Sequence, residues 1–238
     1  MKRFLLAGLF AVCGLAQSAT LDTRLSYDSV SEAYTQRVLV YNGWANGVAG
    51  FIDIPFSLTR SNFSDDIDTL KNVGTIELSG WWTTPLTKEF YLRPNLNILV
   101  GPAGPTWRPT ISLGYKPSPQ FDSWLRYRYS KRNYSTANNA GVQDKDNAHL
   151  VTLWAGWKYS ATLEFEYQGD FIKRINNYWN DNRKSQIIET EFQVNFPNAF
   201  GKGVTPYVLI DHLGTSFKTF DGKERDRWRP RAGVKLAF

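Results

Sequence analysis

The amino-acid sequence predicts an all-β fold, an antiparallel barrel whose strands cross a membrane. Three observations lead to this prediction: an N-terminus typical of exported proteins, a series of segments in which polar and apolar residues alternate, and connecting loops of unequal length. Aromatic residues make up 15% of the 238 residues, with 9 Trp and 12 Tyr, and Trp and Tyr concentrate at membrane–water interfaces. Composition alone leaves a secreted β-sandwich carbohydrate-binding domain as the alternative.

The first 18 residues have the pattern of a secretory signal peptide. A short basic start, Met1–Arg3, is followed by an apolar run and a small-residue cleavage site. We expect cleavage after Ser18 or Ala19, which leaves residues 19–238 as the barrel domain. The apolar run is shorter than the ~18–20 residues of a membrane helix. The single cysteine, Cys13, lies in this segment, so no disulfide is expected in the mature chain.

The C-terminal segment from Arg227 to Phe238 shows the alternation of a membrane strand. One face carries Trp228, Pro230, Ala232, Val234, Leu236 and Phe238, and the other carries Arg227, Arg229, Arg231, Gly233, Lys235 and Ala237. In a transmembrane barrel the apolar face meets lipid and the polar face meets a wet lumen. An exported protein with such strands belongs in a bacterial outer membrane.

Eleven further segments alternate in the same way, which predicts a 12-stranded antiparallel transmembrane β-barrel. The expected strands are 20–27, 34–41, 48–58, 73–83, 90–100, 107–115, 123–131, 148–159, 162–171, 186–196, 204–213 and 227–238. Loops after odd-numbered strands are mostly long and those after even-numbered strands short, as in barrels with short periplasmic turns. An even number of strands places both termini in the periplasm. The facing of 204–213 is ambiguous, and Pro94 lies unexpectedly inside a strand.

The same periodicity places basic residues of the inner face in two groups on opposite walls. The first group is Arg24, Arg37, Arg229, Arg231 and Lys235, and the second is Arg93, Arg108, Lys116, Arg126 and Arg128. Guanidinium groups bind carboxylates in a bidentate manner, and a series of weak sites lets an ion enter a channel and leave it. We therefore expect passive, anion-preferring uptake of acidic oligosaccharides or sugar acids. In the alternative interpretation, about half of these arginines only pair with lumen carboxylates and hold the wall together.

The same alternation assigns aromatic residues to the inner or the outer face of the barrel. Trp124 faces inward and is the candidate for stacking on a sugar. The expected lipid-interface girdle consists of Trp44, Trp82, Trp107, Trp157, Tyr127, Tyr129 and Trp228.

Over the whole mature length, the chain resembles the oligogalacturonate-specific porin family, which includes an N-acetylneuraminate (sialic acid) channel. The resemblance rests on the twelve strands, the arginines of the first two strands, and three motifs: Trp124-Leu125-Arg126-Tyr127-Arg128-Tyr129, Thr205-Pro206-Tyr207 and the ending 228–238. It implies a monomeric, anion-preferring channel for acidic oligosaccharides, lined by two arginine tracks. The terminal Phe238 resembles the assembly signal of outer-membrane proteins.

Two other function classes were weighed against a channel. A phospholipase-like outer-membrane enzyme needs a His oriented toward a nucleophile, and His149 and His212 lie in no recognisable Ser/His motif. A structural barrel without transport is the second alternative. No cofactor or metal site is expected, and the partners should be acidic sugars and outer-membrane lipid, with no nucleic acid.

Overall fold

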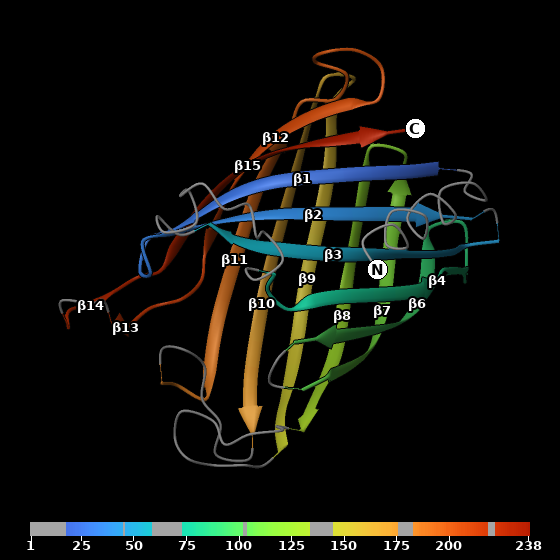
Figure 1. The fold of residues 1–238 in the computed structure, drawn as a ribbon. Helices are drawn as coiled ribbons and strands as arrows, with labels where there is room; N and C mark the ends of the chain where they lie inside the picture. Colours follow the sequence, from blue (N-terminus) through green and yellow to red (C-terminus); the bar gives the residue numbers. More distant parts are fainter. Residues whose placement is uncertain are drawn as a thin grey trace, which may run out of the picture.

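A closed antiparallel β-barrel forms the structure, a computed structural model that describes residues 18–44, 46–58, 73–101, 104–133, 145–175, 183–218 and 222–238. Figure 1 shows the strands winding around a common axis, with the first strand beside the last. Apart from Ser18, the predicted signal peptide lies outside the described residues. None of the described segments forms a helix with the length and apolar character to cross a membrane.

Twelve long strands make up the ring in the described part of the chain, which also contains three two-residue strands that add no position to it. The long strands are β1 (Ser18–Asp28), β2 (Ala33–Gly43), β3 (Val48–Leu58), β4 (Ile76–Trp82), β6 (Phe90–Val100), β7 (Thr106–Ser118), β8 (Phe121–Asn133), β9 (Lys145–Ser160), β10 (Leu163–Ile175), β11 (Gln186–Asn195), β12 (Val204–His212) and β15 (Trp228–Ala237). The short strands are β5 (Thr84–Pro85), β13 (Phe217–Lys218) and β14 (Glu224–Arg225).

The two ends of the chain close the barrel. β1 pairs with β15 from Thr20 opposite Ala237 to Ser26 opposite Arg231, and every other long strand pairs with its neighbours along the chain. Both β4 and β5 pair with β6, so β5 continues the line of β4 and adds no position to the ring. Closure leaves no exposed strand edge, which is the condition for strands to cross a bilayer.

Burial is inverted relative to a soluble protein. On the outer face, large apolar side chains are exposed, for example Leu153 (52%) and Ile188 (62%). On the inner face, polar side chains are buried, with Thr152, Asn195 and Asp211 at 0–2% exposure. Alternation of this kind suits a lipid-facing exterior and a polar interior.

The structure settles the facing of β12, which the sequence left ambiguous. Tyr207 and Leu209 are buried on the inside, whereas Val208 and Ile210 are about half exposed on the outside. The inner face of β12 thus carries bulky side chains beside Asp211, and this mixture is why the alternation was hard to interpret.

Pro94 lies where the sheet is already interrupted. The β4–β6 ladder ends at Trp81 opposite Asn95, and the β5–β6 pairing begins at Thr84 opposite Leu92. The backbone N–H of Thr83 donates to the carbonyl of Gly47 instead of to β6. A residue without an N–H is tolerated at such a break.

Several boundaries differ from the sequence prediction. The loop expected over 132–147 is shorter, because β8 continues to Asn133 and β9 begins at Lys145. The fourth strand begins at Ile76, and Val73 forms only an isolated bridge to Phe56. The expected loop 214–226 contains the β13–β14 hairpin, whose strands are too short to show an alternation in the sequence.

Candidate functional site in the barrel interior

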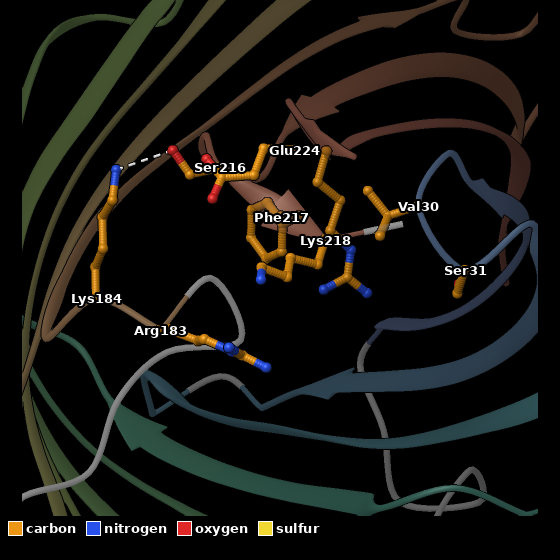
Figure 2. A pocket seen from close by; sticks show the side chains of 9 residues that line it. Val30, Ser31, Arg183, Lys184, Ser216, Phe217, Lys218 and Glu224 are labelled. Atoms are coloured by element: carbon orange, nitrogen blue, oxygen red, sulfur yellow. Dashed lines mark hydrogen bonds between the residues drawn. The ribbon is translucent and has the colours of Figure 1, made fainter. Parts of the chain in front are cut away.

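At the end of the barrel with the longer connections, a basic cavity of about 840 Å³ forms the mouth. Figure 2 shows Arg183, Lys184 and Lys218 around this cavity, with the Phe217 ring between them. Lys184 donates a hydrogen bond to Ser216 Oγ at 3.1 Å, which joins the segment before β11 to the segment before β13. The sequence placed all of these residues in loops and assigned them no role.

Arg227 fastens the mouth to the barrel wall. Its guanidinium pairs with Asp28 Oδ2 at the end of β1, at 2.6 and 2.7 Å, and lies over the Phe217 ring, 5.3 Å from the centroid. Two charge-assisted hydrogen bonds on one carboxylate hold the side chain in a single orientation. The hairpin that borders the mouth is therefore anchored to β1.

Deeper in the barrel, most cations of the first predicted group are paired with carboxylates. Arg37 Nε lies 2.5 Å from Asp53 Oδ1 and Arg229 Nε lies 2.8 Å from Asp211 Oδ2. Arg231 also pairs with Asp211, and its Nη1 lies 3.4 Å from Glu191 Oε2.

Lys235 and Arg24 complete this wall. Lys235 Nζ lies 3.3 Å from Glu166 Oε1 on β10, so its side chain passes over β12 and β11. Arg24 lies opposite Arg37 in the β1–β2 pair and, among the described residues, forms no ion pair.

The opposite wall, formed by β6, β7 and β8, differs in its charge balance. In the described part of the chain, none of its predicted arginines forms an ion pair with a carboxylate; these are Arg93, Arg108, Arg126 and Arg128. Within the same part, the Nε atoms of Arg108, Arg126 and Arg128 are buried and have no hydrogen-bond partner. We call these four residues the unpaired arginine track.

Two further arginines, which are not counted as members of the track, lie next to it on the side of the mouth. Arg108 and Arg128 share a cavity of about 120 Å³ with Arg132 and Arg174. Arg132 donates to Thr106 Oγ1 at 2.7 Å. The sequence prediction missed both because it ended the strands at residues 131 and 171, yet each continues the inward alternation of its strand.

Arg126 reaches a carboxylate only through a hydroxyl. Its Nη2 donates to Thr152 Oγ1 at 3.0 Å, and that hydroxyl donates to Asp170 Oδ1 at 2.5 Å. The guanidinium also lies 4.7 Å from the centroid of the Trp124 ring. The cation is thus oriented by a neutral hydroxyl and an aromatic face, which leaves its charge without a direct counter-ion.

At the short-turn end, a second large cavity of about 700 Å³ contains two predicted site residues, Arg93 and Trp124. Tyr41, Trp81 and Trp154 also border it, and the sequence analysis did not single them out. Trp44, expected in the outer girdle, borders this cavity as well. Other girdle residues are exposed on the outer face, including Trp82 (54%) and Trp157 (50%).

The two histidines lie apart from any arrangement of nucleophile and base in the described residues. His149 Nδ1 is 2.7 Å from the Tyr127 hydroxyl. His212 Nε2 is 3.5 Å from Asp226 Oδ2, and its ring lies against Trp228 at 4.6 Å between centroids. Tyr127 and Trp228 are both about 43% exposed on the outer face, so both imidazoles are associated with that side.

Comparison with known proteins identifies the family. The oligogalacturonate-specific porin protein family (KdgM) matches residues 12–238. The N-acetylneuraminic acid outer membrane channel protein NanC of Escherichia coli (strain K12) is 24% identical over 216 residues, 89% of each chain.

Solved structures share the fold. A NanC porin structure has a TM-score of 0.78 at 22% identity, covering 91% of this chain and 98% of that one. A KdgM porin in complex with disordered oligogalacturonate has a TM-score of 0.63 at 14% identity, covering 92% and 99%. The chain therefore belongs to the oligogalacturonate-specific porin family and is an outer-membrane β-barrel, as its sequence predicted.

Proposed function

We propose that the barrel is a passive, anion-preferring channel for acidic oligosaccharides or sugar acids. The observation that carries this proposal is the charge imbalance between the two walls. Cations on β2 and β15 are largely neutralised by carboxylates, whereas the unpaired arginine track on β6–β8 has no ion-paired member among the described residues. Because an unpaired guanidinium in a water-filled lumen attracts carboxylates, this wall favours anions.

A row of inward side chains on β8, which includes two members of the track, follows the length of the barrel. From the long-loop end inward, β8 carries Arg132, Arg128 and Arg126 and then Trp124, all with the same side-chain parity. Eight residues at ~3.3 Å each span roughly 26 Å, close to the thickness of a bilayer core. A carboxylate entering the basic mouth passes from one guanidinium to the next, with several weak sites in place of one tight site.

Relatives support the substrate class. One is named as a channel for N-acetylneuraminic acid, and another was solved with oligogalacturonate. Both ligands are sugars that carry a carboxylate, which is the group that a row of guanidiniums recognises.

A channel is favoured over an enzyme. Serine hydrolases need a base within hydrogen-bond reach of a nucleophile. His149 is hydrogen-bonded to a tyrosine hydroxyl, and His212 lies beside the Asp226 carboxylate. The relative from Escherichia coli is named as a channel. We further propose a monomer surrounded by outer-membrane lipid, with both termini and the short turns in the periplasm. This orientation follows from the strand number and the loop lengths.

The test is the reversal potential of the purified protein in a planar bilayer under a KCl gradient. Wild-type protein should prefer chloride. In the variant Arg126→Ser/Arg128→Ser the anion-to-cation permeability ratio should fall about twofold to fivefold, because a unit charge near a permeating ion in water is worth about 1 kcal/mol.

The matched control is Arg37→Ser/Asp53→Ser, which removes a cation together with its paired carboxylate. Its permeability ratio should stay close to that of wild type. Unchanged selectivity in the Arg126/Arg128 variant would refute the role of the track, and folded wild-type protein without conductance would refute the channel.

A further inference from the structure

Two aromatic pairs from different parts of the ring border the 700 Å³ cavity at the short-turn end. Trp124 on β8 and Trp154 on β9 are stacked, with centroids 5.6 Å apart and planes at 11°. Tyr41 on β2 and Trp81 on β4 are also stacked, at 5.7 Å and 28°. All four side chains are partly exposed, so they present aromatic surface to the cavity.

Charged groups border the same cavity beside these rings. Arg93 donates to Thr83 Oγ1 at 3.1 Å, lies 5.0 Å from the Tyr91 ring centroid, and forms no ion pair with any described carboxylate. Asp122 accepts a hydrogen bond from the Tyr91 hydroxyl at 2.9 Å through Oδ1. The cavity therefore combines one unpaired cation, one hydrogen-bond acceptor and aromatic surface.

Gly156 on β9 leaves room for the Trp154 ring on the inner wall. The six-membered ring of Trp154 lies over Gly156, where a Cβ atom would come within 2.6 Å of Cη2. A side chain at that position would push the indole away from the wall and from Trp124. The absence of a side chain at Gly156 therefore leaves the space that the Trp154 indole occupies.

We propose that this cavity is a subsite for the ring of a sugar acid in its cyclic form, at the periplasmic end of the arginine track. The ring packs on the Trp124–Trp154 pair, Arg93 binds the carboxylate, and Asp122 accepts a sugar hydroxyl. The inference rests on the proposed channel function and adds a selectivity for ring shape.

The chemistry of the subsite separates cyclic from open-chain acids. A pyranose ring has a face of C–H bonds whose partial positive charge suits the negative face of an indole. Inorganic anions and open-chain sugar acids carry the charge without that face. Charge alone then admits an anion along the track, and the aromatic subsite retains those with a ring.

The experiment measures block of single-channel current by galacturonate and by gluconate, an open-chain acid of the same charge. Wild-type protein should be blocked at lower concentration by galacturonate. In Trp124→Leu/Trp154→Leu, the blocking concentration of galacturonate should rise about threefold to tenfold, while that of gluconate stays unchanged. Leucine keeps an apolar side chain at each position without supplying an aromatic face.

The control is Trp157→Leu, a substitution on the outer face that should leave both blocking concentrations as in wild type. A second variant, Gly156→Ala, should weaken galacturonate block without removing any aromatic ring. Equal block by the two acids in wild type, or unchanged galacturonate block in the double variant, would overturn the subsite. Such results in a barrel that prefers anions leave the proposed channel standing, whereas wild-type protein that conducts without anion preference refutes the proposed anion-preferring channel itself.

Discussion

At the scale of single residues, Asp211 holds the paired wall together. Its carboxylate is 2% exposed and pairs with both Arg229 and Arg231. Taking charges out of water is costly, and it is offset here because two guanidiniums share one carboxylate. Without that carboxylate, Arg229 would lose its counter-ion, and Arg231 would keep only Glu191.

We expect Asp211→Asn to destabilise the barrel. The free energy of unfolding should fall by about 3 kcal/mol, because removing the shared carboxylate leaves Arg229 without a counter-ion and weakens the compensation of Arg231. The measurement is reversible urea unfolding of the protein in lipid vesicles.

A partly exposed pair supplies the control for this prediction. Glu164 lies 3.8 Å from Lys158, whose side chain is 63% exposed. Glu164→Gln should therefore cost less than about 1 kcal/mol. Equal losses in the two variants would show that Asp211 has no special part in the wall.

At the scale of strands, glycines allow aromatic rings to lie flat on neighbouring strands inside the barrel. A Cβ atom on Gly114 of β7 would come within 1.9 Å of the Tyr91 ring on β6, and one on Gly233 of β15 would come within 2.5 Å of the Tyr207 ring on β12. The hydroxyls of both tyrosines then reach carboxylates one strand further on, Asp122 and Asp22 respectively. Each ring thereby links three adjacent strands.

Gly114→Ala should displace the Tyr91 ring and break its hydrogen bond to Asp122. We expect a loss of about 1–3 kcal/mol in the free energy of unfolding, which is the usual cost of forcing extra volume into a packed site. Gly80→Ala is the matched control, since nothing lies within 4 Å of a Cβ atom there. If both variants unfold at the same urea concentration, the ring does not depend on the glycine.

At the scale of the whole molecule, the barrel has two different ends and two different walls. The long-loop end opens into a basic mouth, and the short-turn end leads into the aromatic cavity. β15, β1 and β2 lie roughly across the ring from β6, β7 and β8. An anion therefore meets cations first, an unpaired track next, and aromatic surface last.

The orientation can be tested with single cysteines, since Cys13 is the only natural one and lies in the expected signal peptide. Lys223→Cys lies beside the β13–β14 hairpin and Lys202→Cys in the turn between β11 and β12. On intact cells, a polyethylene-glycol maleimide too large for the channel should label only position 223. Position 202 should react once the outer membrane is permeabilised, and the reverse pattern would place the termini outside.

The sequence by itself determined the long strands and, except on β12, the face on which their residues lie. The predicted segments 48–58 and 90–100 coincide with β3 and β6, because a period of two over eleven residues has one structural interpretation. The sequence also indicated that the barrel is closed. A last strand that faces lipid needs a hydrogen-bonded neighbour on each side, and β1 is the second neighbour of β15.

Only the tertiary structure decided which inner residues meet. Parity assigns a face, but the contact between Lys235 and Glu166 depends on the curvature that brings β15 toward β10 across two strands. Which inner arginines have no carboxylate partner among the described residues was likewise decided by the tertiary structure. So was the position of Trp81 and Trp154, which border one cavity although 73 positions of sequence separate them. Stagger between strands and distance across the ring are long-range properties of a closed barrel, and local periodicity carries no information about them.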